Sequence, residues 1–244
     1  MSDTDPARYG QMWAAVYDEV HSHMDPAATA DLLYQLAAGG RALELGIGTG
    51  RVAIPLAARG VVVHGVDASE AMVQRLRAKP GGASIPVTLG DFASIAVDGG
   101  PYTLVYVVFS TLFGLPTQDA QVGCFRRVEA LLAPGGVFVV EAFVPDVARF
   151  DRHQRVHVNR IEPGRVDVSL TRHDQVAQRI TSQHVTLTDG SVKLLPVDMR
   201  YAWPSELDLM ARLANLRLRE RWSDWQRGRF TAASGIHVSV YERA

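Results

Sequence analysis

The chain is poor in cysteine and in lysine, and neither sign of charge is in excess. Its single cysteine, Cys124, excludes an intrachain disulfide and is typical of proteins kept in a reducing cytoplasm, where we expect this one. The basic residues are almost all arginine, with lysine only at positions 79 and 193. A formal net charge of −1 and a pI near 6.7 exclude a general attraction to nucleic acid or to anionic membranes.

Long apolar runs are also missing. None approaches the roughly 20 residues that a membrane-spanning helix needs. The first ten residues, MSDTDPARYG, are polar and acidic, which is not the composition of a secretion signal. We therefore expect neither a membrane nor nucleic acid among the partners.

What the sequence does contain is a long alternation of apolar and amphipathic stretches. With 244 residues, 47% of them hydrophobic, it suffices for one large domain or for a domain with an insertion. Asp5-Pro6 and Asp25-Pro26 are helix-start signals, so two helices are expected before residue 41. Strands are predicted at 41–46, 61–67, 85–90, 102–109 and 135–143, and helices at 51–59, 69–78 and 117–132. Near-continuous apolar strands are typical of a parallel sheet covered on both faces, so the expected class is α/β.

A glycine-rich turn follows the first predicted strand. It runs Glu44-Leu-Gly46-Ile-Gly48-Thr-Gly50 and leads into a helix. Glycines let a ligand lie against bare backbone near the positive end of the following helix. The dinucleotide fingerprint G-x-G-x-x-G would need its third glycine at Arg51, so this turn does not match it.

Two further acidic residues follow the next two strands. Asp67 lies 21 residues beyond Gly46, where a carboxylate can accept both hydroxyls of a ribose, or alternatively cap a helix. Asp91 and Phe92 follow the third strand, where they can meet an adenine amino group and ring. Met72 can pack on the adenine or belong to the core. An open α/β sheet binds its ligand at the carboxyl ends of its strands, so these positions should converge.

Together these three strand ends resemble the pattern of class I S-adenosylmethionine (SAM) methyltransferases, over about residues 9–145 and 204–243. The resemblance implies a doubly wound, mostly parallel seven-stranded sheet, Rossmann-like, whose final strand is antiparallel and lies beside the fifth. It implies SAM as cofactor and S-adenosylhomocysteine as product, with the methionine part in the glycine turn. The cofactor-binding residues it implies are Tyr17, Glu44, Gly46, Gly48, Thr49, Gly50, Arg51, Asp67, Ala68, Met72, Asp91, Phe92 and Phe109.

Features near the fourth and fifth strands favour a small-molecule methyltransferase. The Asn/Asp-Pro-Pro-Tyr/Phe motif of nucleobase and glutamine methyltransferases is absent, and Phe109-Ser110 stands in its place. This pair, and Glu141 followed by aromatic residues and proline, look like glycine and deoxyaminosugar N-methyltransferases. One departure is Tyr102-Thr103, where the family usually has Phe-Asp, which concerns local packing.

After residue 150 the periodicity changes from mixed to alternating. Residues 155–161, 165–170, 180–187 and 192–203 read as antiparallel strands with one polar face, separated by Pro163-Gly164 and Asp189-Gly190 turns. We expect helices at 1–40 to cap the cofactor, a SAM-binding core at 41–149 and 204–244, and an insertion at 150–203. The insertion would serve as lid, as substrate platform, or as the contact of a homodimer.

The sequence says least about the residues that bind and activate the methyl acceptor. Tyr17, His21 and Glu141 are the candidate catalytic residues, because Tyr17-Asp18 matches a family pair that covers SAM and His21 lies one helical turn further on. Weaker candidates are His23, His157, His184 and Tyr201, then His153, His173 and His237. No spacing of ligands indicates a metal. The function expected is methyl transfer to an amine or hydroxyl of a metabolite or natural product; the alternatives are an RNA or protein methyltransferase, an NAD-dependent oxidoreductase, and a non-catalytic SAM-binding regulator.

Overall fold

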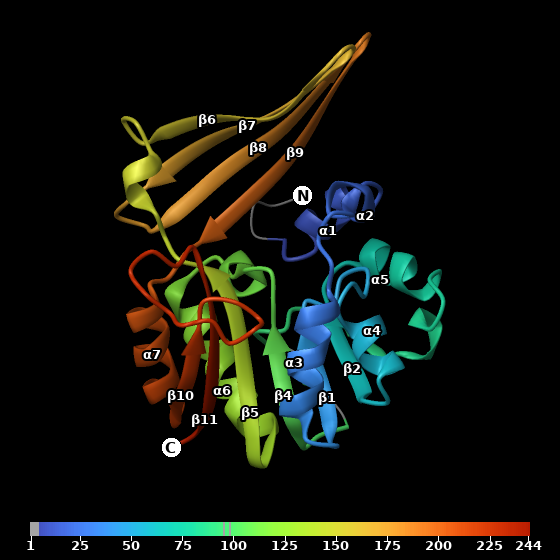
Figure 1. Ribbon diagram of the computed structural model, residues 1–244, viewed down its shortest axis with the longest axis vertical. Coiled ribbons are helices and arrows are strands. Elements are labelled where there is room, and N and C mark those ends of the chain that lie inside the picture. The colour runs from blue at the N-terminus through green and yellow to red at the C-terminus, as the bar shows by residue number, and fades with distance from the viewer. Residues whose placement is uncertain (1–4, 95, 98) are drawn as a thin grey trace.

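The computed structural model describes residues 5–94, 96–97 and 99–244. Its main body is a seven-stranded sheet, called the core sheet below, with strand order β10-β11-β5-β4-β1-β2-β3 (Figure 1). The strands are β1 Arg41–Leu45, β2 Val62–Asp67, β3 Val87–Leu89, β4 Tyr102–Val107, β5 Leu132–Phe143, β10 Leu216–Trp222 and β11 Ile236–Arg243.

The core sheet is parallel except at one edge. Strands β1 to β5 pair in parallel, while β11 is antiparallel to both β5 and β10 and lies between them. The side chains of β4 are almost all fully buried, as a strand covered on both faces requires. The expected doubly wound fold, with its last strand antiparallel beside the fifth, is confirmed.

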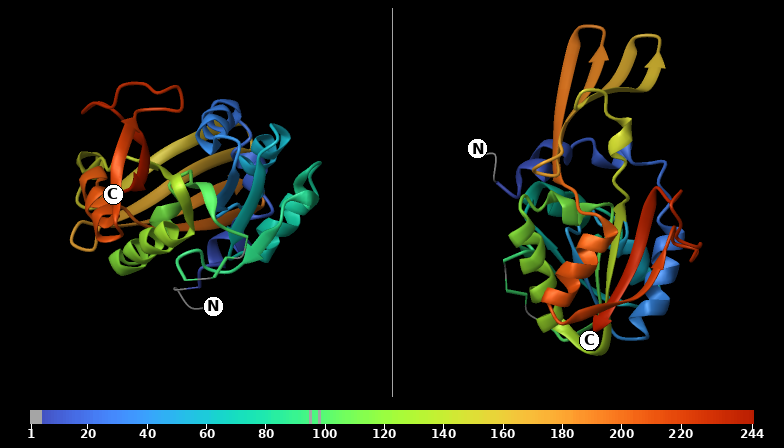
Figure 2. Two further views of the ribbon diagram at one scale, coloured as in Figure 1. Left: turned by 90° about the horizontal axis from the view of Figure 1, so that it is seen from below. Right: turned by 90° about the vertical axis from the view of Figure 1, so that its left-hand side faces the viewer.

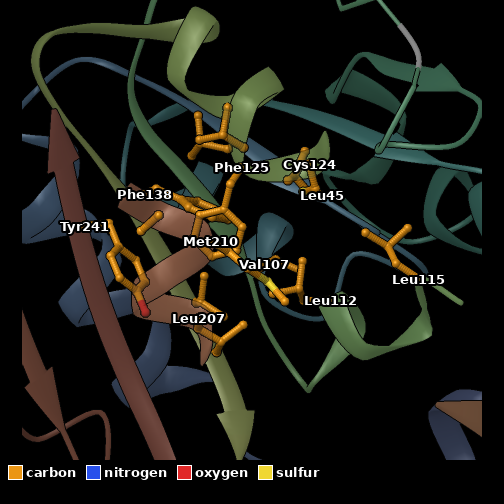
Figure 3. Packing of buried hydrophobic residues seen from close by; sticks show 14 of the residues in the cluster. Leu45, Val107, Leu112, Leu115, Cys124, Phe125, Phe138, Leu207, Met210 and Tyr241 are labelled. Carbon is orange, nitrogen blue, oxygen red and sulfur yellow. The ribbon is translucent and has the colours of Figure 1, made fainter. Parts of the chain in front are cut away.

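Helices cover the core sheet on both faces. The helices are α3 Ala27–Ala37, α4 Ala53–Ala58, α5 Glu70–Arg77, α6 Gln118–Leu131 and α7 Pro204–Leu213. On one face α6 and α7 contribute to one apolar cluster, and on the other α3 and α4 contribute to a second. Figure 3 shows Phe125 of α6, Phe138 of β5 and Tyr241 of β11 packed around Leu207 and Met210 of α7.

Two details differ from the sequence expectation. The first apolar helix is two short helices, α1 Arg8–Trp13 and α2 Tyr17–Val20, so three helices precede β1. The break separates Trp13, whose Nε1 donates to the Pro196 carbonyl, from Tyr17, which lines the cavity described below. On α7 the spacing of Leu207, Leu209, Met210 and Leu213 predicts one apolar face, but Leu209 and Leu213 are more than half exposed. This helix lies at the end of the sheet, so only the narrow stripe through Leu207 and Met210 meets the core.

A second sheet stands off the core, and we call it the platform. It consists of β6 Gln154–Glu162, β7 Arg165–Asp174, β8 Arg179–Thr188 and β9 Ser191–Arg200, antiparallel and in sequence order. It projects from the carboxyl edge of the core sheet, over α1 and α2 (Figures 1 and 2). Arg200 anchors its last strand, since the guanidinium donates to Glu206 Oε1 at 2.7 Å and to Gln121 Oε1 at 2.6 Å.

Within the part of the chain that the structure describes, no helix is both long and apolar enough to cross a membrane.

Candidate active site

A cavity of about 270 Å³ lies at the carboxyl edge of the core sheet. Its lining comes from the segment from Asp5 to Tyr17, from the ends of β1 to β4, from the loop before α6, and from β8 and β9 of the platform. A smaller recess of about 20 Å³ adjoins it behind the glycine turn, and Tyr17, Gly46, Gly48 and Phe109 line both. The strand ends therefore converge, as the sequence pattern predicts.

The glycine turn exposes backbone to this cavity. Gly46 and Gly48 have φ of 72° and 55°, and both line the cavity. A Cβ on Gly46 would stand 2.4 Å from Thr111 Cγ2, whereas one on Gly48 would meet no atom closer than 4.0 Å. The face of Gly48 is thus open to a ligand. Gly50 lines neither cavity; a Cβ there would press on Leu76 at 3.0 Å, so its role is packing.

Asp67 fixes the glycine turn from the end of β2. Its carboxylate accepts from the Gly48 N–H at 2.7 Å and from the Ser69 N–H at 2.8 Å. Burial raises the pKa of Asp67, and these backbone donors oppose the rise. The cap of α5 is Ser69, whose Oγ accepts from the Met72 N–H at 3.3 Å. Asp67 is therefore not needed as the side-chain cap of α5, and it lines the cavity, as Met72 does.

Behind the turn, Arg51 faces a buried carboxyl group. Glu44 is 2% exposed and accepts from Tyr106 Oη at 2.9 Å, and burial raises the pKa of Glu44 to about 8. The Arg51 guanidinium lies 5.1 Å from the centre of the Phe109 ring, and its Nε is buried without a partner among the described residues. An unpaired buried donor on a cation, lining the smaller recess, fits an anionic ligand group such as a carboxylate.

The N-terminal helices close over the turn. Asp18 Oδ1 accepts from Thr49 Oγ1 at 2.7 Å and from Lys79 Nζ at 2.8 Å, while Lys79 also donates to the Thr49 carbonyl at 2.9 Å. These contacts hold α2 against the loop after β1. They place the Tyr17 side chain in the cavity wall, where burial raises the pKa of Tyr17 and keeps it protonated.

Asp91 and Phe92, from the loop after β3, line the cavity together with Ala68 and Met72. Asp91 Oδ1 accepts from the Ala93 N–H at 2.9 Å, which stabilises the loop after β3. An acidic group and an aromatic ring therefore follow the third strand, beside the end of β2 with which β3 pairs.

The other expected catalytic residues do not line the cavity. The Glu141 carboxylate accepts from the Phe109 N–H, and burial raises the pKa of Glu141. The His21 ring packs edge-on against Phe109 with centroids 4.9 Å apart, and burial lowers the pKa of His21 to about 4. His184 packs under Trp13, and Tyr201 bonds to His173 at the base of the platform. His23, His157, His153 and His237 likewise lie outside the lining.

Several lining residues were not found from the sequence. Tyr9 and Arg8 come from α1, Leu115 and Pro116 from the loop before α6, and Arg179, Asp198 and Met199 from the platform. No motif marks them, because they reach the cavity only through the packing of separate elements. Among the described residues, no three histidine, cysteine, aspartate or glutamate side chains gather as metal ligands.

The fold and this cavity define a class of protein: an open α/β enzyme that holds an adenosine-containing cofactor at the carboxyl edge of its sheet. Residues 42–136 match the model of a methyltransferase domain family. The CcbJ methyltransferase from Streptomyces caelestis is 41% identical, with 98% of this chain and 99% of that chain covered and a TM-score of 0.92. The chain therefore belongs to the SAM-dependent methyltransferase family, and SAM is its cofactor.

Two other relatives are more distant. SAM-bound CalS10, an amino pentose methyltransferase from Micromonospora echinaspora, has a TM-score of 0.69 at 20% identity, over 94% of this chain and 97% of that one, and so shares the fold. The putative methyltransferase YqeM of Bacillus subtilis is 31% identical over 134 residues. That match covers 54% of this chain and 54% of YqeM, so the chain spans about half the length of this curated relative.

The residues present fit the cofactor. SAM supplies a methyl group activated by a positive sulfur. The open face of Gly48 and the unpaired Nε of Arg51 suit its methionine part, the Asp67 carboxylate suits the ribose, and Phe92 suits the adenine.

Proposed function

We propose that this protein methylates an amine of a small molecule. The observation that carries the proposal is that the cavity extends beyond the predicted cofactor residues, to Arg8 and Tyr9 of α1 and to residues 196–200 of β9. A cavity of about 270 Å³ between these elements suits a compact acceptor better than a polymer. The names of the relatives agree with this choice, since CalS10 is an amino pentose methyltransferase.

The titratable groups favour an amine over a hydroxyl. A neutral amine is already nucleophilic and needs only desolvation and a group that takes up its proton, whereas an alcohol needs a strong base. Burial raises the pKa of both Tyr9 and Tyr17, so neither is ionised near neutral pH. Neither tyrosine is therefore the strong base that an alcohol would need.

The chain's own contribution is positioning. The lining side chains hold the acceptor in line with the activated methyl, and such alignment supplies several kcal/mol of the barrier reduction. Tyr17 covers one side of the cavity, and the hydrogen bonds of Asp18 with Thr49 and Lys79 hold α2 in place there, so this side is shielded from water. The platform closes the other side through residues 196–200 of β9.

We further propose that the platform acts as the acceptor lid and that its outer face is the contact of a homodimer. Val158, Val168, Val185 and Leu194 stand in register across its four strands, and Val158 and Leu194 are about half exposed. An apolar row of this kind is a common surface for self-association. Sedimentation equilibrium tests this; a monomer at micromolar concentration contradicts the homodimer.

The first experiment is calorimetric titration with SAM, S-adenosylhomocysteine and NADH. We expect micromolar binding of the first two and none of the third. Matched acceptor pairs, such as an aminosugar and the same sugar with a hydroxyl in place of the amine, then give the reaction class by mass spectrometry. Turnover of the hydroxyl partner alone refutes N-methylation, and SAM binding without turnover of any acceptor favours a regulator.

A further inference from the structure

Two consecutive residues after β4 have an unusual backbone. Phe109 and Ser110 have φ of 58° and 57°, in the left-handed region that side chains other than glycine rarely adopt. Such a conformation is strained, and it persists only where the surrounding structure holds it in place. Both residues line the cavity.

The end of β5 holds this turn by three hydrogen bonds. The Phe109 N–H donates to the Glu141 carboxylate, and the Ser110 N–H donates to the Glu141 carbonyl at 3.1 Å. In return, the Phe143 N–H donates to Ser110 Oγ at 3.1 Å. Glu141 therefore contributes both its side chain and its backbone to one strained turn.

The turn decides where the Phe109 ring lies. That ring is 4.9 Å from the His21 ring on α2 and 5.1 Å from the Arg51 guanidinium, measured between centroids and to the guanidinium carbon. It lines both the main cavity and the recess behind the glycine turn. A shift of the Phe109 ring would thus change its contacts with His21 at the end of α2 and with the Arg51 guanidinium, and would change the cavity wall.

We propose that Glu141 is a positioning residue, whose carboxylate holds the Phe109 backbone N–H and thereby fixes the Phe109 ring between the cofactor and the acceptor. The carboxylate is directed at the backbone and is absent from the cavity lining, so it acts through Phe109 and not on the acceptor. For the acceptor side, this inference rests on the proposed function.

Two substitutions separate a positioning role from that of a base. In Glu141→Gln the amide oxygen can still accept from the Phe109 N–H, but the side chain can no longer take a proton. In Glu141→Ala both capacities are lost. A positioning role therefore predicts that Gln restores what Ala removes, and a base predicts that both variants lose turnover alike.

The first readout needs neither cofactor nor acceptor. The imidazole protons of His21 feel the ring current of Phe109, so their NMR shifts report the position of that ring; Phe109→Leu identifies the signal. We expect Glu141→Ala to move the His21 signal towards its position in Phe109→Leu, and Glu141→Gln to leave it near that of the wild type. An unmoved signal in a folded Glu141→Ala overturns the proposal.

Ligand binding and turnover give the second readout. We expect S-adenosylhomocysteine to bind about tenfold more weakly to Glu141→Ala, and kcat on an amine from the acceptor panel to fall about 100-fold, the effect of misplacing a reacting group. Glu141→Gln should stay within about threefold of the wild type in both. If Gln loses turnover as far as Ala, Glu141 is a base and the proposal is wrong.

A third variant guards against misfolding. If Glu141→Ala is unfolded, Ser110→Ala removes the Oγ acceptor from the other side of the same turn and should move the His21 signal in the same direction. An unchanged His21 signal in a folded Ser110→Ala would show that the hydrogen bonds of this turn do not fix the Phe109 ring, and would contradict the proposal. Failure of the wild type to bind S-adenosylhomocysteine would contradict the assigned cofactor, while the ligand-free NMR comparison would still decide the role of Glu141.

Discussion

The core sheet and the platform are both built of strands, yet they differ in nearly every physical property. Strand β4, at the centre of the core sheet, is buried at every residue except Thr103, which is partly buried. Strand β6 of the platform is exposed at almost every residue. Parallel strands require cover on both faces, whereas an antiparallel sheet can leave one face to solvent.

The core sheet and the platform contribute different kinds of residue to the active site. The core sheet places its functional groups at strand ends, where backbone geometry fixes them, and these groups suit a cofactor that is the same throughout the family. The platform adds side chains such as Arg179 and Asp198 from an edge, with little packing behind them. Such positions can change without loss of the fold, so we infer that the platform sets which acceptor is used.

The largest expected effect on stability comes from removing Trp13, which joins the core to the platform. Trp13 is 2% exposed, packs with Leu195 of the platform and Met72 of α5, and donates from Nε1 to the Pro196 carbonyl at 3.0 Å. Trp13→Ala should lower the free energy of unfolding by about 3–5 kcal/mol, the usual cost of removing a large buried ring. Chemical denaturation measures this.

Trp13→Phe is the matched control. It keeps most of the volume and loses the hydrogen bond to Pro196, so its cost should be about 1–2 kcal/mol. An unfolding transition of the core that is unaffected by Trp13→Ala would mean that the two regions unfold independently, against the joint described above.

The next effect distinguishes the regions by ligand affinity. Asp67→Ala removes the acceptor of the Gly48 N–H and the proposed ribose partner, so SAM should bind about 1–3 kcal/mol more weakly. Asp198→Ala, on the platform side of the same cavity, should leave SAM affinity within about threefold. Calorimetry of both variants measures the contrast, and equal losses would place the cofactor against the platform.

The third effect is a pH dependence of opposite sign for buried carboxyl groups and buried histidines. The pKa of Glu44 in the core is raised to about 8 from 4.5, so the folded state keeps a proton that the unfolded state has released. Stability therefore falls as pH rises from 6.5 to 8, by at most about 2 kcal/mol for one group. Asp67 and Glu141, whose pKa values are also raised, act in the same direction.

Histidines act in the opposite sense. Burial lowers the pKa of His184 in the platform below 6.5, and of His21 to about 4, so the unfolded state is protonated first and stability falls as pH drops below 6.5. Thermal unfolding between pH 6.5 and 8 isolates the carboxyl contribution. Glu44→Gln should flatten that part of the curve, and an unaltered slope would assign it elsewhere.

The smallest effect comes from making one change in both sheets. Val158 of β6 is 49% exposed in the single chain, so at concentrations where the protein is a monomer Val158→Thr should alter the free energy of unfolding by less than about 0.5 kcal/mol. The matched change Val105→Thr buries a hydroxyl in β4, where Val105 is 0% exposed, and should cost about 1–3 kcal/mol. Thermal denaturation compares the two. A large loss at Val158 would show that its face is covered, as a homodimer requires.

The sequence by itself determined the core of this protein. The glycine turn, Asp67 and the Asp91-Phe92 pair were found by position alone, since each follows an apolar strand. Parallel strands bring their carboxyl ends to one edge, so the order of motifs along the chain is enough to predict that they meet. The alternating residues after 150 likewise predicted a second, antiparallel sheet.

Only the tertiary structure decided what depends on distant contacts. Trp13 donates a hydrogen bond to a carbonyl 183 residues away, a contact that joins α1 to β9, the platform strand that lines the cavity. Glu141 had the spacing expected of a catalytic group, but its carboxylate points to the backbone of Phe109. A sequence pattern fixes which residues end a strand; the direction of a side chain and its partners follow from packing between elements, which no local pattern encodes.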